Sequence, residues 1–305
     1  MLNRVLTIAA AGAALLSSAA FAAGGETKEL KHNHWHWQGL GGQYDQAEMQ
    51  RGYQVYRNVC AGCHSMDLVA FRHLGDAGAP FHLDRCPEAL GLPSSVDCSD
   101  PAANPIIKSL AAEFTITDGP DEFGDDFTRP GLPSDHFPSP FANSAQAAAA
   151  NGGAVPPDLS LIAKARHHGP DYIYSLLTGY PEENPEILDV PAGQYYNPYY
   201  PGDTLSLVRE EFLDEEGHLL EGYKLPYGGA FKMSQPLYDG MITYDDGSPE
   251  TIEQYAKDVV AFLQWAAEPK LNERKRTGGF VMAYLFIFAG ITYASYRQIW
   301  SNVGK

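Results

Sequence analysis

Cys60-Ala61-Gly62-Cys63-His64, in the first quarter of the chain, has the spacing C-x-x-C-H. Two thiols three positions apart can each form a thioether bond with one edge of a haem, and the histidine that follows can ligate the iron from one face. The motif therefore predicts one c-type haem, attached covalently through Cys60 and Cys63, with His64 as the proximal iron ligand.

A zinc site or a redox-active dithiol is the alternative use of this motif. A structural zinc would need a second pair of ligands at the usual spacing, which Cys86 and Cys98, the other two cysteines, do not provide. A thioredoxin-like dithiol would need a βαβ context, and the flanking sequence shows none. We therefore favour the haem.

Residues 1–22 have the organisation of a secretory signal peptide. Arg4 supplies the positive charge, residues 5–16 form the apolar segment, and Ala20-Phe21-Ala22 is a cleavage site of the small-x-small type. The apolar run is short for a bilayer span, which disfavours an uncleaved anchor. Export agrees with the haem prediction, because c-type haem is attached outside the cytoplasm.

Cys86 and Cys98 are the pair that remains once Cys60 and Cys63 are assigned to haem. An exported protein can form disulfides, and a bridge would stabilise residues 75–105, which are rich in Gly, Pro and Asp. Two buried free thiols are the alternative.

The chain is acidic, with a net charge of −17 over 305 residues, and removal of residues 1–22 takes away one more positive charge. Nucleic acid is excluded as a natural partner because its phosphates would be repelled. Carboxylates cluster in residues 118–126 and 210–216. They favour a basic protein partner, with a merely solubilising surface as the alternative.

Residues 278–296 hold no charged side chain and are long enough to cross a bilayer as a helix. The basic residues that flank this run are Arg274, Lys275 and Arg276 before it and Arg297 and Lys305 after it. The positive-inside rule would place the larger, preceding cluster in the cytoplasm. Export of the haem domain requires the opposite orientation, and we give it priority. The predicted domains are a periplasmic haem domain over 23–270 and a membrane anchor with a short cytoplasmic tail over 271–305.

Two helices frame the predicted haem domain. Asp45 and Glu48 form a capping box, which predicts a helix running to about Asn58. Gly52 inside it lowers helix propensity, and close approach of another helix would explain it. The candidate partner begins at Ser248-Pro249 and ends before Pro269. Its apolar positions at helical spacing are Ile252, Tyr255, Ala256, Val259, Leu263 and Ala266.

Shorter patterns predict local structure elsewhere. Residues 144–150 suit a short helix, and a second helix is expected to begin near Pro170, with an apolar face of Tyr172, Ile173, Leu176 and Leu177. His32, His34 and His36 alternate along the chain and could bind a metal if extended, although such runs are more typical of a surface.

Two methionines are candidates for the second axial ligand. Met233 lies in residues 225–236, a loop bounded by Gly and Pro as a strap over a haem face would be. Met241 leads instead into a β-like segment, residues 242–244. The remaining methionines of the mature chain are placed wrongly for this role: Met49, Met66 and Met282. We favour Met233, which would raise the redox potential and close the iron to substrates.

With these features the chain resembles the cytochrome c1 family, the haem subunits of ubiquinol–cytochrome c oxidoreductases (bc1 complex, complex III). The resemblance covers nearly the whole mature chain. The motifs that carry it, besides C-x-x-C-H, are RGYQVY (51–56), SMD (65–67), PPDLS (156–160), ARH (165–167), DY (171–172), YNPYYPG (196–202), WAAEP (265–269), RKR (274–276) and the C-terminal apolar span.

The resemblance implies a mainly α fold: a cytochrome c-type haem domain with long irregular insertions, two crossing terminal helices and one C-terminal transmembrane helix in a bacterial inner membrane. It implies electron transfer without catalysis of its own, from a Rieske iron–sulfur protein to a soluble cytochrome c, beside cytochrome b. Met233 is then the distal ligand, Arg166 pairs with a haem propionate, and Pro157 and Tyr172 line the pocket. Residues 76–105 and 203–224 depart from the family pattern.

Three other functions compete with this one. The chain could be the haem subunit of another membrane respiratory complex, which the resemblance over 156–180 disfavours. It could be a haem enzyme or sensor with an open iron, which a strap methionine disfavours. A structural subunit with an incidental haem fits neither the strap methionine nor the acidic surface.

Overall fold

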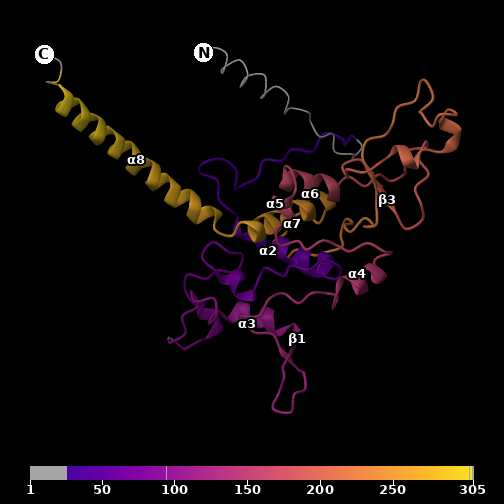
Figure 1. Cartoon of the computed structure of the whole chain (residues 1–305). Coiled ribbons are helices and arrows are strands. Elements are labelled where there is room, and N and C mark those ends of the chain that lie inside the picture. The colour runs from indigo at the N-terminus through magenta and orange to yellow at the C-terminus, as the bar shows by residue number, and fades with distance from the viewer. Residues whose placement is uncertain (1–25, 94, 302, 304–305) are drawn as a thin grey trace. The chain divides into compact units, whose positions relative to one another are not determined.

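The computed structural model describes residues 26–93, 95–301 and 303, and it is mainly helical with two short two-stranded sheets (Figure 1). Two compact units are present. Among the described residues, one consists of 30–179 and 232–301, and the other of 26–29 and 180–231. The predicted mainly α fold is confirmed. The predicted signal peptide and Lys305 lie outside the described residues.

Helix α2 (Gln46–Val55) delivers the chain into the haem motif. Asp45 caps its start, with its side chain accepting from the backbone N–H of Glu48 at 2.8 Å. The helix then widens into one π-helical segment, η1 (Tyr56–Cys60), so helical backbone reaches the first cysteine. Only half of the predicted capping box forms, because the Glu48 carboxylate is bound instead to His36 Nδ1 at 2.9 Å.

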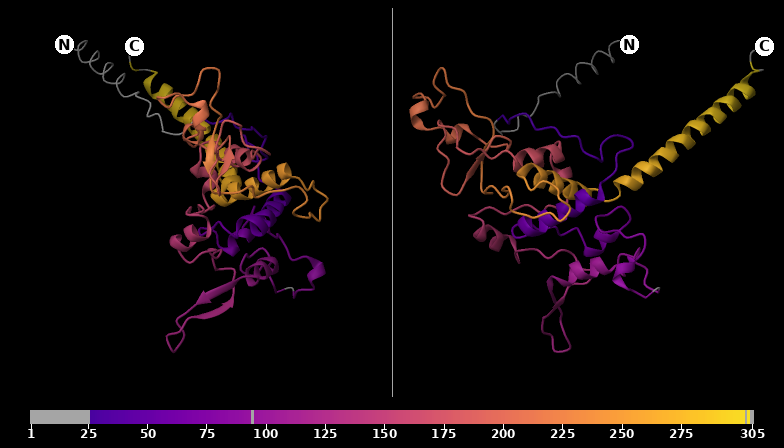
Figure 2. Two further views of the ribbon diagram at one scale, coloured as in Figure 1. Left: turned by 90° about the vertical axis from the view of Figure 1, so that its right-hand side faces the viewer. Right: turned by 180° about the vertical axis from the view of Figure 1, so that it is seen from behind.

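Helix α7 (Ile252–Ala267) packs against α2, and the two lie side by side in every view (Figures 1 and 2). A Cβ added to Gly52 would stand 2.0 Å from the backbone oxygen of Asp258, which confirms the predicted close approach. The start of α7 differs from the prediction: Thr251 caps it by accepting from Gln254 N, so the helix begins after Ser248-Pro249.

A buried ion pair lies beside this crossing. The Asp258 side chain is 0% exposed and accepts from Arg51 Nε at 3.0 Å and from Nη2 at 2.9 Å. Arg51 Nη1 also donates to Asp246 at 2.7 Å. The arginine therefore joins α2 to α7 and to the loop that precedes α7.

The remaining elements of the larger unit are short. Helices α5 (Ile162–Ala165) and α6 (Gly169–Leu177) pack on α7, and the predicted helix at 144–150 is α4 (Ser144–Ala150). The other helical elements are η2 (Phe71–Gly75), η3 (Glu88–Leu90) and α3 (Pro105–Ala112). Strands β1 (Thr115–Asp118) and β2 (Phe127–Pro130) form an antiparallel hairpin that the sequence did not indicate, and its turn carries most of the acidic run at 118–126.

The β-like segment predicted at 242–244 is wrong, since no strand forms there. Ile242 N donates to the Tyr255 hydroxyl at 3.2 Å, and that hydroxyl donates to Ile242 O. A side chain of α7 thus replaces the partner strand, although Ile242 and Tyr244 are buried as strand residues would be.

The smaller unit contains strands β3 (Tyr195–Asn197) and β4 (Gly229–Phe231), paired antiparallel with Tyr196 opposite Ala230. Tyr200 stacks on Phe231 with ring centroids 4.5 Å apart. The 3-10 helices of this unit are η4 (Leu205–Leu207) and η5 (Glu210–Phe212), and its core residues are Leu188, Tyr196 and Val208.

Helix α8 (Leu271–Trp300) contains the predicted span. Within the described residues it is the one helix long and apolar enough to cross a membrane, and its apolar stretch is not buried by the rest of the chain. The predicted C-terminal transmembrane helix agrees with this finding.

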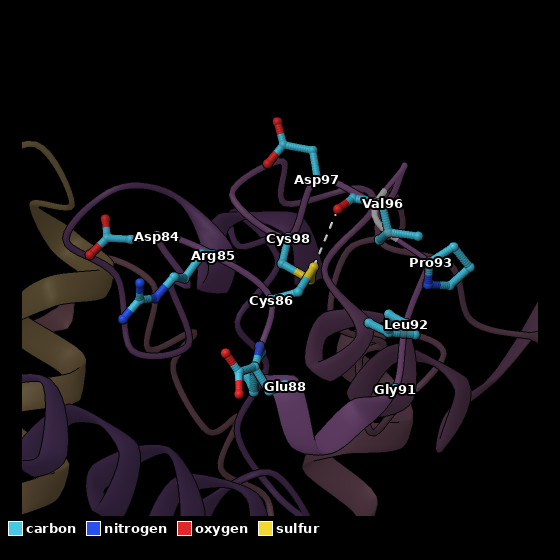
Figure 3. A pocket seen from close by; sticks show the side chains of 11 residues that line it. Asp84, Arg85, Cys86, Glu88, Gly91, Leu92, Pro93, Val96, Asp97 and Cys98 are labelled. Atoms are coloured by element: carbon cyan, nitrogen blue, oxygen red, sulfur yellow. Dashed lines mark hydrogen bonds between the residues drawn. A yellow bond between two sulfur atoms is a disulfide. The ribbon is translucent and has the colours of Figure 1, made fainter.

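Cys86 and Cys98 form the predicted disulfide (Figure 3). Asp84, Glu88 and Asp97 line the same concave surface as the bridge. The dashed line in Figure 3 joins Cys86 Sγ to the carbonyl oxygen of Val96 at 3.3 Å. The bridged sulfur carries no hydrogen, so this is a packing contact. The bridge closes a loop in the segment that departs from the family pattern.

Replacing Gly52 with Ala should separate α2 from α7. Its Cβ would overlap a backbone atom that cannot rotate away, so we expect Gly52→Ala to lower the free energy of unfolding by about 1–3 kcal/mol or more. The measurement is urea unfolding followed by circular dichroism. Gly41→Ala is the control, because a Cβ there meets no atom within 4 Å. Equal stability of the two variants would contradict the close approach.

Candidate haem-binding site

The two cysteines of the C-x-x-C-H motif lie on one tight turn at the end of η1. Ala61 N donates to Tyr56 O at 2.8 Å, and both Cys63 N and His64 N donate to Cys60 O, at 3.1 and 2.9 Å. Both thiols are free; Cys60 is half-buried and Cys63 is exposed. Burial raises the pKa of the Cys60 thiol to about 12. The two thiols and the imidazole are therefore all carried by the same short turn, Cys60 to His64.

His64 is oriented by a backbone carbonyl. Its Nδ1 lies 2.8 Å from Pro157 O, and because a carbonyl can only accept, Nδ1 carries the hydrogen. The lone pair is then on Nε2. Burial lowers the pKa of His64, against the opposing effects of the Pro157 bond and the Asp158 charge. Burial therefore favours the neutral imidazole, and the bond to Pro157 selects the tautomer that can ligate iron through Nε2.

Asp158 ties the segment that carries this carbonyl to the haem motif. Its carboxylate accepts from Ser65 Oγ, Asp67 N and Ser160 N, each at 2.8 Å. Burial would raise the pKa of Asp158, but these hydrogen bonds outweigh it and hold the pKa below its ordinary value. The carboxylate is therefore ionised at neutral pH, with well-satisfied oxygens.

Two further bonds extend this clamp. Leu159 N donates to Ser65 O at 2.9 Å, and Leu68 N donates to Ser160 Oγ at 3.1 Å. Pro157 is expected from the resemblance to line the haem pocket, and in the structure its carbonyl oxygen accepts from His64 Nδ1. Asp158 was missed as a positioning residue, because nothing in the sequence shows which distant N–H groups it will meet.

The two candidate methionines have different surroundings. Met233 is half-buried and packs against the main core. Met241 is exposed, and its sulfur accepts from Tyr238 N at 3.3 Å. The thioether of Met241 is therefore occupied in its own turn.

Arg166 and Tyr172 come from the two short helices that pack on α7. Arg166 is the C-cap of α5; its guanidinium is exposed and donates to Ala165 O at 3.3 Å. Among the described residues it has no carboxylate partner within ion-pair distance. Tyr172 lies on α6, half-buried against the main core. Neither contact tests the propionate or pocket role implied by the resemblance.

The histidine run does not form a metal site. Trp35 and Trp37 are buried, whereas the three histidines between and around them are exposed. His32 Nδ1 lies 2.8 Å from an oxygen of Asp171, whose carboxylate also accepts from Trp35 Nε1 at 2.8 Å. No cluster of three metal-binding side chains occurs in the part of the chain that the structure describes. Instead, His32 binds the entry segment to Asp171 of α6, and His36 binds it to Glu48 of α2.

The donor set fits a c-type haem. It offers two thiols on one turn, an imidazole whose Nε2 carries the lone pair, and a half-buried thioether at Met233. These are the groups such a haem requires for attachment and for two axial bonds.

Comparison with known proteins gives the following relatives. The sequence model of the Cytochrome C1 family matches residues 35–303. The chain is 40% identical to "Cytochrome c1" of Rhodospirillum rubrum, over 97% of this chain and 96% of that protein. It is 39% identical to "Cytochrome c1 1, heme protein, mitochondrial" of Arabidopsis thaliana, over 98% of this chain and 82% of the relative. It is 39% identical to "Cytochrome b/c1" of Bradyrhizobium diazoefficiens, over 97% of this chain but only 39% of that longer protein.

Replacing Asp158 with Asn should loosen the clamp. Three donors lose an anionic acceptor and face an amide, so we expect the free energy of unfolding near neutral pH to fall by about 1–3 kcal/mol. The stabilisation from Asp158 is present above the ordinary aspartate pKa of about 4 and is lost as the pH falls through its lower folded-state pKa. The difference between Asp158→Asn and the parent should therefore shrink in acid. Urea unfolding over a pH series measures it.

Asp67→Asn is the matched control for this experiment. It removes the same charge from the neighbouring segment, but the exposed Asp67 carboxylate accepts no hydrogen bond among the described residues. A gap between Asp158→Asn and the parent that stayed constant with pH, or that Asp67→Asn reproduced, would contradict the clamp.

Proposed function

The chain belongs to the cytochrome c1 family, and we propose that it is a membrane-anchored electron carrier with one c-type haem attached through Cys60 and Cys63. A haem held there would supply one-electron transfer between ferric and ferrous iron. The chain's own part is to hold the haem, fix its ligands and limit access to the iron.

The observation that carries the proposal is the 2.8 Å bond between His64 Nδ1 and Pro157 O. It sets the imidazole tautomer and orientation, and it does so directly after a turn that holds two free thiols. A zinc site is disfavoured, because no group of three or more His, Cys, Asp or Glu side chains that could hold a metal ion occurs among the described residues.

We assign Met233 as the second axial ligand. Its half-buried place against the core supports this role, whereas Met241 is exposed. A methionine that stays bound in both oxidation states would favour ferrous iron and exclude external ligands. These properties suit an electron carrier and not an oxygen-binding enzyme or sensor. Arg166 is assigned to a haem propionate, and Pro157 and Tyr172 to the pocket.

The proposed electron path runs from a Rieske iron–sulfur protein to a soluble cytochrome c, within a bc1 complex that includes cytochrome b. Family membership supports the complex. The name of the Bradyrhizobium relative, which joins b and c1, supports the cytochrome b partner. The net charge of −17 favours a basic soluble acceptor, since opposite charge speeds encounter.

We place the protein in a bacterial inner membrane, anchored once by α8. The haem domain is on the periplasmic side and the short C-terminal tail on the cytoplasmic side. The support is the length and apolar character of α8, together with the need to attach c-type haem outside the cytoplasm.

Cys60→Ala combined with Cys63→Ala should abolish haem that survives denaturation. Both thioether bonds would be absent, so the band detected by haem staining on a denaturing gel should disappear. The Cys86→Ala, Cys98→Ala double variant is the control, because it removes two sulfurs outside the motif. A stained band that persisted in the Cys60/Cys63 variant would refute covalent attachment.

Met233→Leu should open the iron. We expect the iron–sulfur charge-transfer band of the ferric protein to vanish, the potential to fall, and carbon monoxide to bind the reduced form. Optical titration against electrode potential and against carbon monoxide measures all three. Met241→Leu is the matched control and should leave them unchanged. The reverse pattern would transfer the ligand assignment to Met241.

A further inference from the structure

Residues 38–42 form a loop with an apolar tip that the proposed function does not use. Leu40 is 99% exposed, so it contacts almost nothing in its own chain. Its neighbours in sequence are Gly39, Gly41 and Gly42, and no residue of the loop is charged. The leucine therefore presents nearly its whole side chain to the surroundings of the protein.

The loop has a defined shape. Gln38 N donates to Trp35 O and Gln43 N donates to His36 O, each at 3.0 Å, which closes its base. Gly39 has a left-handed φ of 71°, and a Cβ on Gly42 would stand 2.0 Å from Gln38 O. Gly39 and Gly42 are therefore required by the turn, and Leu40 lies between them.

The loop is fastened to the base of α8 by Lys275. The ammonium donates to the carbonyls of Trp37, Gly39 and Gly42, at 2.5, 2.7 and 3.0 Å. This uses all three of its N–H donors. Tyr44 N, just after the loop, also donates to Asn272 Oδ1 of α8 at 3.2 Å.

Lys275 places the loop close to the start of the apolar run of α8. It precedes the uncharged run that starts at Gly278 by three residues, which is about 4.5 Å along a helix axis at about 1.5 Å per residue. The carbonyls that bind Lys275 therefore lie at the level where α8 leaves the polar domain and becomes apolar.

We propose that the 38–42 loop is a second membrane contact, in which Leu40 inserts into the lipid interface beside α8. Lys275 holds the loop at that depth, and the uncharged loop can enter the interface without desolvating a charge. The loop is bound to the base of α8, the helix that carries the apolar run. It rests on the proposal that α8 spans the membrane, and it would attach the haem domain to the bilayer at two points instead of one.

The test is site-specific photo-crosslinking of the full-length, haem-loaded protein in native membranes. The photoreactive residue is introduced as Leu40→p-benzoylphenylalanine. We expect lipid adducts on the peptide that contains position 40, identified by mass spectrometry. Phe123→p-benzoylphenylalanine is the exposed control, because Phe123 is 80% exposed but stands among the carboxylates of the hairpin turn. It should give at least tenfold fewer lipid adducts.

Leu285→p-benzoylphenylalanine, within α8, separates the two proposals. If position 285 gives no lipid adduct, the membrane anchor itself is refuted. If position 285 labels lipid and position 40 gives no adduct or labels only protein, the loop inference alone is overturned. Adding Lys275→Gln should lower the lipid adducts at position 40 several-fold and leave those at 285 unchanged. Unchanged labelling at position 40 would overturn the role of Lys275.

Discussion

The contact between Gly52 and the backbone of Asp258 is the constraint on which the larger unit depends. With no Cβ at Gly52, α2 and α7 approach until a side chain would overlap a carbonyl oxygen. The same crossing buries the Asp258 side chain completely, and Arg51, the residue before Gly52, compensates its charge. Removing one member of such a pair is costly, about 3–5 kcal/mol, because the other charge is left buried. The close approach of α2 and α7 therefore also requires a basic residue at position 51, beside the buried Asp258.

The crossing of α2 and α7 also positions the C-x-x-C-H motif. Helix α2 runs without interruption into η1, so the backbone that is held against α7 ends at Cys60. The opposite side of the motif is held by Asp158, 93 residues after Ser65 in the sequence. One side is thus fixed by helix packing and the other by hydrogen bonds to a loop. The His64–Pro157 bond forms where the two meet.

Sequence reasoning succeeded where the signal was local or forced by elimination. The helix start at Asp45, the glycine at a close contact, the Cys86–Cys98 bridge and the apolar run of α8 are all of this kind. It failed where a distant group competed for a polar atom. Glu48 was expected to cap its own helix and binds His36 instead, and the segment at Ile242 was expected to pair as a strand and binds the Tyr255 hydroxyl. The haem ligands, His64 included, remain predictions, since their geometry depends on the haem itself.

The basic residues before α8 illustrate the same limit. By composition, Arg274, Lys275 and Arg276 argue for a cytoplasmic position, against the signal peptide. In the folded chain Arg274 pairs with Glu268, with Nε at 2.8 Å, and Lys275 is bound by three carbonyls of the entry segment. Two of the three charges therefore serve the junction between the haem domain and its anchor, and they must lie on the same side of the membrane as that domain. The positive-inside rule counts Arg274 and Lys275 as unpaired charges, although both have partners within the folded chain. The count at this junction is thus a poor guide to orientation, and the side on which haem can be attached is the stronger argument.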